Sequence, residues 1–230
     1  MNGTYIVERG VGVQPAPSFV RTHRATTRET LMTRKLTLED IADLREYERE
    51  REEFRSEVIA LKKKRRVGVG PFMTVVFENR ETIRFQIQEM ARVERLATDT
   101  AIETELRTYN PLVPEPGELA ATLFIELTTE PALREWLPRL VGIEQHVALR
   151  AGEGDDAVLL RAAPEAAHAS QLTRDEITAS VHYVHFQLTA DQIEAVAAGP
   201  VELFIDHAEY DHATRLQDET VAELLADLRD

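Results

Sequence analysis

The sequence predicts an α+β fold: a mixed, largely antiparallel sheet with packed helices and a long charged helical segment near the N-terminus. Short β-rich runs adjoin one another as well as helical stretches, which does not fit a regular βαβ repeat. A stretch of almost uninterrupted charge over residues 48–53 lies between apolar residues at helical spacing. With 43% hydrophobic and 30% charged residues in 230, the chain has enough apolar side chains to build a core.

The predicted organisation is an N-terminal arm over residues 1–32 followed by a single α+β domain over residues 33–230. The arm contains Pro15 and Pro17, has no helical or strand period, and precedes an internal Met32 that opens a more regular segment. We expect the arm to be flexible. An over-extended start of the chain is the alternative reading of the same residues.

The first half of the domain is expected to be mainly helical. Thr37 has the character of an N-cap and is followed by acidic residues, so a long helix, or two consecutive ones, should begin there. Gly68 and the pair Gly70-Pro71 should end it. The next expected elements are a strand over 72–78, a turn at 79–80, a helix over 82–96 and a helix that stops at 109–111, where Asn110 precedes a proline.

The second half is expected to alternate between strands and short helices. A capping-box pattern at residues 189–192 predicts the start of one helix, and Gly199-Pro200 should end it. Residues 151–156, 163–177 and 206–212 are polar or weakly patterned and are predicted to be loops. The remaining elements are strands over 121–127, 180–188 and 201–205, a hairpin of 146–150 with 158–161, and helices over 131–140 and 220–228.

The composition excludes several classes of site. The chain has no cysteine, so it cannot form disulfides, thiolate zinc sites, iron-sulfur clusters bound by its own cysteines, or a cysteine nucleophile. No apolar stretch is long enough to span a bilayer, and no apolar signal core is present near the N-terminus. We therefore expect a cytoplasmic protein without membrane insertion.

The charge is unevenly distributed along the chain. The formal net charge is −14, and it divides into +4 for residues 1–66 and −18 for residues 67–230. Because nucleic-acid affinity comes largely from basic side chains on phosphates, nucleic-acid binding is disfavoured. The exception is the basic run Lys62, Lys63, Lys64, Arg65 and Arg66. It is a candidate for binding an anion, an acidic partner or the protein's own acidic half, and the simpler alternative is a solvated helix end that complements the helix dipole.

Several strings of the sequence carry a family resemblance, and together they extend over about residues 33 to 228. They are Arg34 to Leu38 (RKLTL), Phe77 to Arg80 (FENR), Phe85 to Glu94 (FQIQEMARVE), Tyr109 to Leu112 (YNPL), Gly142 to His146 (GIEQH), Ser180 to Tyr183 (SVHY) and Ile205 to His207 (IDH). The chain resembles the bacterial domain-of-unknown-function family 3501, which has no established activity. The resemblance implies a cytosolic protein whose gene neighbours encode rubrerythrin-like and heterodisulfide-reductase-like iron-sulfur proteins, and hence a role near electron transfer or oxidative stress.

The polar side chains of these motifs, together with those of the predicted loop 206–212, form a candidate polar site. Its members are Arg80, Gln86, Gln88, Arg92, Tyr109, Asn110, Asp206 and Tyr210. Loops on a rigid scaffold are frequent places for binding and catalytic residues. Ser180 lies two residues before His182, but no glycine-rich elbow surrounds it, so nucleophilic catalysis is disfavoured.

Carboxylates within apolar rows and late histidines suggest a metal site. Glu89 and Glu94 interrupt apolar rows of one predicted helix, and their five-residue separation turns them apart. A buried carboxylate needs a cation, a metal or a raised pKa. A mixed site for iron, manganese or zinc would use Glu89, Glu94, Glu144, His146, His182 and His207. The alternatives are ion pairs with Arg84, Arg92 or another arginine, and hydrogen-bonded core histidines.

Two functions remain open from the sequence. The first is an accessory or interaction protein of a redox or oxidative-stress system, with rubrerythrin-like or iron-sulfur oxidoreductase partners as the resemblance implies. The second is a metal-binding protein or metal-dependent enzyme that uses the mixed histidine and carboxylate site. The sequence does not decide whether the chain is an enzyme.

Overall fold

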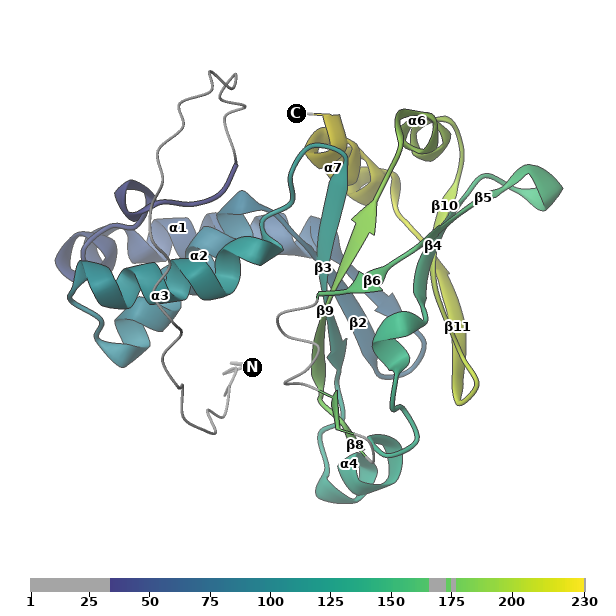
Figure 1. Ribbon diagram of the computed structural model, residues 1–230, viewed down its shortest axis with the longest axis horizontal. Helices are drawn as coiled ribbons and strands as arrows, with labels where there is room; N and C mark the ends of the chain where they lie inside the picture. Colours follow the sequence, from purple (N-terminus) through teal and green to yellow (C-terminus); the bar gives the residue numbers. More distant parts are fainter. Residues whose placement is uncertain (1–33, 166–172, 175–176, 230) are drawn as a thin grey trace, which may run out of the picture. The chain divides into compact units, whose positions relative to one another are not determined.

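The computed structural model describes residues 34–165, 173–174 and 177–229 (Figure 1). The described residues all belong to one compact unit. The predicted N-terminal arm lies outside the described residues. Among the described residues, no helix combines the length and the apolar character needed to cross a membrane.

Three helices form a layer on one side of the larger sheet (Figure 1). They are α1 (Leu44–Arg65), α2 (Arg80–Glu94) and α3 (Asp99–Tyr109), accompanied by short 3-10 turns η1 (Leu38–Asp40) and η2 (Asn110–Leu112). The long charged helix predicted near the N-terminus is confirmed as α1. Its N-cap is Asp43, whose side chain accepts hydrogen bonds from the backbone of Arg45 and Glu46, whereas Thr37 caps only η1.

The second helix of this layer begins where the sequence predicts a turn. Asn79 is its N-cap and exchanges hydrogen bonds with Thr82 in a capping box, so residues 79–80 start α2 instead of turning the chain. Ile83 and Ile87 of α2 pack with Leu106 of α3 in a second, smaller core. Helix α3 ends at Tyr109, as predicted from the proline two residues later.

Two large antiparallel sheets and one two-stranded sheet carry the β structure of the described residues. The five-stranded sheet has the order β1 (Arg66–Val69), β2 (Met73–Glu78), β3 (Glu118–Ile125), β9 (Val181–Gln187) and β6 (Ala163–Pro164). The four-stranded sheet has the order β11 (Tyr210–Arg215), β10 (Val201–His207), β4 (Val147–Ala151) and β5 (Val158–Arg161), and β7 (Thr173–Arg174) pairs with β8 (Ile177–Thr178). The α+β class and the antiparallel pairing are confirmed.

The remaining helical elements connect or cover the sheets. They are α4 (Glu130–Trp136), η3 (Ile143–Gln145), η4 (Gly154–Asp156), α6 (Ala190–Ala198) and α7 (Asp218–Arg229). The capping box predicted at residues 189–192 is present at the start of α6. The hairpin predicted for 146–150 and 158–161 is the β4–β5 pair.

The loop prediction for residues 206–212 is wrong. Strands β10 and β11 continue through this segment and pair as far as His207 and Tyr210, leaving a two-residue turn at residues 208–209. Part of the predicted loop 163–177 also lies in the short strands β6, β7 and β8, while residues 166–172 and 175–176 lie outside the described residues.

The main core lies between the two sheets. Phe77 and Leu123 of the five-stranded sheet pack in one cluster with Leu149 and Leu203 of the four-stranded sheet. Strand β2 is buried at all six positions, because α1 packs on the opposite face of the same sheet. Polar side chains on the face of the sheet that α1 covers are therefore buried as well.

Tyr210 joins the two sheets at one edge. Its hydroxyl donates to the carbonyl of Val69 at 2.6 Å and accepts from the backbone nitrogen of Phe72 at 3.3 Å. Gly70, between these two residues, has φ of +68°, and a Cβ there would lie 2.5 Å from the Tyr210 hydroxyl. The turn between β1 and β2 therefore requires glycine at this position.

Candidate functional site

The basic run 62–66 ends α1 and begins β1, and its members point to different neighbours. Successive residues on a helix are rotated by about 100°, so adjacent cations cannot form one patch. The Nζ of Lys62 lies 3.9 Å from Oε2 of Glu78 on β2. Arg66 forms an ion pair with Glu126, just after β3. The first contact joins the end of α1 to the five-stranded sheet, and the second joins β1 of that sheet to the residue that follows β3.

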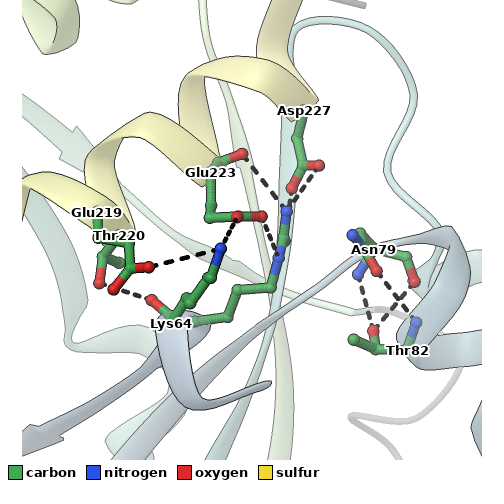
Figure 2. A network of polar contacts seen from close by, with 8 residues as sticks. Lys64, Asn79, Thr82, Glu219, Thr220, Glu223 and Asp227 are labelled. Atoms are coloured by element: carbon green, nitrogen blue, oxygen red, sulfur yellow. Dashed lines mark hydrogen bonds and ion pairs between the residues drawn. The ribbon is translucent and has the colours of Figure 1, made fainter. Parts of the chain in front are cut away.

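The middle of the run contacts α7, and we call this contact the α1–α7 seam (Figure 2). The Nζ of Lys64 lies 3.5 Å from Oε1 of Glu219 and 3.4 Å from Oε1 of Glu223. Arg65 is 1% exposed and its two Nη atoms contact the two carboxylate oxygens of Asp227 at 2.7 and 2.9 Å. Its Nε lies 3.4 Å from Oε2 of Glu223. Planar, bidentate contact of this kind is the strong form of an arginine–carboxylate pair.

These contacts favour one of the roles expected for the basic run. Lys62, Lys64, Arg65 and Arg66 all pair with acidic residues of the same chain, which is the expected contact with the protein's own acidic half. Lys63 is exposed. The run therefore does not offer five cations to an external anion, acidic partner or nucleic acid.

Glu89, a predicted metal ligand, is held by two residues of α1. Its carboxylate accepts from the Tyr47 hydroxyl at 2.7 Å and from Nε and Nη2 of Arg51 at 2.7 and 2.9 Å. Burial alone would raise the pKa of Glu89, but the hydrogen bonds from Arg51 and Tyr47 lower it below its ordinary value. The contact is an ion pair with another arginine, the alternative to metal binding. Glu94 is exposed at the last residue of α2.

Glu144 and His182, two more predicted ligands, meet in the core. The Nε2 of His182 lies 2.9 Å from the carbonyl of Ala179, which can only accept, so this nitrogen carries a proton. The Thr178 hydroxyl is also 2.9 Å from Nε2, and Nδ1 lies 3.7 Å from Oε2 of Glu144. Burial lowers the pKa of His182, while Glu144 and the Ala179 carbonyl act in the opposite direction.

His146, which directly precedes β4, lies beside His207 at the end of β10, and we call these two residues the histidine pair. Their ring centroids are 5.0 Å apart and the rings are nearly perpendicular. The Nδ1 of His146 lies 3.1 Å from Oδ1 of Asp206, whose carboxylate also accepts from Arg161. Hydrogen bonds from Arg161 lower the pKa of Asp206, with a smaller contribution from His146. Because an ionised Asp206 can only accept, Nδ1–H of His146 donates to it, and in the neutral ring the lone pair is then on Nε2.

The six predicted metal ligands do not converge on one point. Within residues 34–165, 173–174 and 177–229, no group of three or more histidine, aspartate and glutamate side chains is placed to share a metal ion. The structure brings together two pairs, Glu144 with His182 and His146 with His207, and leaves Glu89 with Arg51.

Several members of the candidate polar site instead fasten residues 34–42 to the helices. Arg80 donates to the carbonyl of Arg34 at 3.1 Å and to Asp40 at 2.5 Å. The side-chain amide of Gln88 accepts from the backbone nitrogen of Ala42 at 2.7 Å and donates to its carbonyl at 3.3 Å.

Asn110 makes the same double contact with Leu36, at 2.7 and 2.8 Å. Arg92 contacts Glu48 at 2.7 Å, Tyr109 is in the smaller core, and Gln86 is half-buried on α2. With Asp206 beside the histidine pair and Tyr210 at the sheet edge, the eight residues do not form a single site.

A polar cluster that the sequence does not predict lies on the helix-covered face of the five-stranded sheet. Oε1 of Glu78 accepts from the Thr122 hydroxyl at 2.8 Å, and Thr122 is the cross-strand partner of Tyr183. Burial, with Tyr109 and Glu78 nearby, raises the pKa of Tyr183 to about 12. Strand alternation can assign Thr122 and Tyr183 each to a face of its own strand, but their pairing depends on register, which the sequence does not specify.

Comparison with known proteins relates most of this chain to one family. The family described as "Protein of unknown function (DUF3501)" matches residues 35–228. A crystal structure of a novel protein of unknown function from Burkholderia pseudomallei K96243 is similar over 84% of this chain and 99% of its own, with 35% sequence identity and a TM-score of 0.76. No curated protein matches the chain.

Proposed function

This chain belongs to the family of proteins of unknown function DUF3501, and from that premise we propose that it is an accessory, interaction protein of a redox or oxidative-stress system. Its proposed partners are rubrerythrin-like proteins and iron-sulfur oxidoreductases. A chain without cysteine leaves any iron-sulfur centre to the partner. This chain would then contribute by binding the partner protein, and the partner would carry the redox centre.

The observation that carries the proposal is the internal use of the basic run. Four of its five cations pair with acidic residues of the same chain, while the whole chain keeps a net charge of −14. The densest positive segment is thus neutralised inside the fold, and the negative excess is left for a partner with a basic face. Complementary charge of this kind accelerates association and selects partners.

The test is recovery of partners from anaerobic native extract on the immobilised full-length chain, with bound proteins identified by mass spectrometry. The extract is applied near 0.01 M ionic strength, where the Debye length is about 30 Å, and near 0.15 M, where it is about 8 Å. We expect rubrerythrin-like or iron-sulfur proteins to be enriched, and more strongly at low salt. The proposal would be overturned if no rubrerythrin-like protein and no iron-sulfur protein were recovered at either salt concentration.

A charge variant with a matched control sharpens the result. Glu50, Glu53 and Glu57 lie on α1 without an ion pair within the described part of the chain, and exchanging all three for glutamine removes three negative charges. Arg49→Gln with Arg55→Gln removes two positive charges from the same helix, outside its first turn. Recovery at low salt should fall for the first variant and not for the second, and equal effects would contradict steering by negative charge.

Metal binding is a second candidate function, and the histidine pair favours it. An imidazole whose other nitrogen is held by a carboxylate is a typical metal ligand, and this is the arrangement of His146 and Asp206. His207 would have to release a contact, since its Nε2 donates to the Val141 carbonyl at 3.3 Å and its Nδ1 accepts from the backbone of Glu209 at 3.2 Å. Both of these hydrogen bonds are long.

Calorimetric titration of the chelator-treated full-length protein with Zn²⁺, Mn²⁺ and anaerobic Fe²⁺ tests this second function. The variants are His146→Ala and His207→Ala, and His212→Ala is the control because His212 is exposed on β11 outside the pair. At least one ion should bind the wild type and bind both pair variants about tenfold more weakly, a loss of about 1.4 kcal/mol. Equal binding to all three variants, or none to the wild type, would refute it.

A further inference from the structure

Two adjoining cavities along η1 and α3 form a groove with an apolar floor. It consists of two adjoining cavities of about 650 and 380 Å³ that share Leu38. We call it the η1–α3 groove and define its floor by Leu38, Ile41, Leu96, Ile102 and Leu106. Leu106 is buried, and the other four are partly exposed.

Acidic residues outnumber basic residues on the rim of the groove. Four acidic residues and two basic ones line it, which gives a net charge of −2. In the part of the chain that the structure describes, none of the six forms an ion pair, so their charges remain available to a partner. The rim residues are Glu39, Asp43, Asp99, Glu103, Arg45 and Arg107.

Hydrogen bonding at the N-terminus of α1 favours the charged form of one rim acid, Asp43. Hydrogen bonds from the backbone nitrogens of Glu46 and Arg45 hold the pKa of Asp43 below its ordinary value. Asp99 is exposed in the first turn of α3, where the helix dipole favours a negative charge. An occupant therefore meets apolar side chains in the floor and negative charges beside them.

We propose that the η1–α3 groove binds a short amphipathic segment of a partner protein, with apolar residues at helical spacing and lysine or arginine beside them. This inference rests on the proposed interaction function and specifies the surface and the chemistry of the partner. From Asp99 to Arg107, α3 borders the groove for about 12 Å, the length of roughly two helical turns. That length fits apolar anchors at positions i, i+3 and i+7 of a docked helix. A purely apolar small molecule would leave the four carboxylates of the rim unused.

A designed peptide tests the groove directly. The probe is a fluorescent 14-residue peptide of leucine and lysine with leucine at positions i, i+3, i+4 and i+7, and a leucine–glutamate peptide of the same pattern is its counterpart. Fluorescence anisotropy with the full-length wild type should show binding of the leucine–lysine peptide and at least tenfold weaker binding of its counterpart. Equal binding of both peptides, or of neither, would overturn the proposal.

Two protein variants with matched controls locate the binding. Ile102→Glu places a charge in the floor, and its control is Val93→Glu at a position that is 69% exposed on α2 outside the groove. The pair Asp99→Lys and Glu103→Lys reverses the rim charge without touching the core. Its control reverses the exposed Glu153 and Asp156 on the far side of the fold, near η4.

Affinity for the leucine–lysine peptide should fall at least tenfold in both groove variants and stay within twofold in both controls. Equal losses in the two charge-reversal variants would mean that net charge alone attracts the peptide, and would overturn the site. Sedimentation of the wild type as a dimer that Ile102→Glu dissociates would assign the groove to a second copy, which also overturns it.

The groove and the proposed function fail in different ways. If the wild type and the Ile102→Glu variant recover the redox partner equally well, the groove proposal fails and the proposed interaction function stands. If the peptide binds as expected but extract yields no redox partner, the groove stands and the assignment to a redox system fails.

Discussion

Asp227→Asn is expected to be the most destabilising single change in the α1–α7 seam. The substitution keeps the size of the side chain but removes the counter-charge of Arg65, which is 1% exposed. Both Nη atoms lose a charged acceptor at 2.7 and 2.9 Å. Only the longer contacts with Glu223 remain, from Nε to its carboxylate and from Nη2 to its backbone carbonyl, both at 3.4 Å. Breaking one partner of a buried ion pair costs about 3 to 5 kcal/mol. For a chain of this size the melting temperature should fall by roughly 10 °C.

Arg65 and Asp227 should also be strongly coupled in their effects on stability. Arg65→Met leaves Asp227 at 13% side-chain exposure, and burial already raises its pKa against the influence of Arg65. This carboxyl can therefore accept a proton, so the cost should lie near the lower limit, about 3 kcal/mol. In the double variant neither charge is left alone. Its loss should be smaller than the sum of the single losses by about 2 kcal/mol.

Urea unfolding followed by far-UV circular dichroism and by Trp136 fluorescence measures these free energies. The control is Glu130→Gln on α4, because the Arg134–Glu130 pair is 79% and 73% exposed and should contribute at most about 0.5 kcal/mol. The expectation is refuted if Asp227→Asn costs less than about 1 kcal/mol, or if the two single losses add without coupling. Either result would mean that the guanidinium is not dependent on this carboxylate.

The Glu89 cluster and Gly70 give further expectations. Since the pKa of Glu89 is lower in the folded than in the unfolded state, its stabilising contribution is complete above the unfolded value of 4.5 and is lost as pH falls through the folded value. The difference in unfolding free energy between the wild type and Glu89→Gln should thus shrink as urea titrations are taken from pH 7 to pH 3, and a constant difference would contradict it. Tyr47→Phe removes one hydrogen bond to the charged Glu89 and should cost about 1.5 kcal/mol at pH 7, with no loss at all counting against the contact. Gly70→Ala should lower the free energy of unfolding by about 2 to 4 kcal/mol in the same assay, because the new methyl group is strained in the left-handed conformation and clashes with Tyr210. The control is Gly68→Ala, which has nothing within 4 Å of its new methyl group and should change stability little. Equal effects of the two substitutions would rule out this role for Gly70.

Local signals in the sequence predict most elements of this fold because they act over a few residues. The capping box at 189–192 and the proline after Asn110 place helix ends correctly. The segment 206–212 reads as a loop in the sequence because β11 is an edge strand, in which Tyr210 is the buried residue and most others are exposed. An edge strand with a single buried residue shows little alternation between apolar and polar residues, so its sequence resembles a loop.

The candidate sites are less predictable, because each depends on partners far away in the sequence. Helical spacing shows that Glu89 interrupts an apolar row and needs a cation. It does not show that the cation is Arg51, 38 residues earlier, since that depends on how α1 packs against α2. Likewise, the basic run is recognisable at once, but the aspartate that pairs with Arg65 lies 162 residues later in the chain.

The two ends of α1 have separate tasks. A helix of 22 residues is about 33 Å long, so the α1–α7 seam at its C-terminal end lies far from the η1–α3 groove at its N-terminal end. Sites separated by more than about 10 Å without shared partners contribute additively to stability. Substitutions at the groove rim should therefore leave the seam intact, and Asp227→Asn should lower stability without changing the groove's affinity for the leucine–lysine peptide at temperatures where the variant is folded. The rigid attachment of one end to the sheets and α7 is what allows the other end to present a preformed surface, because an anchored helix loses little further conformational entropy when a partner binds.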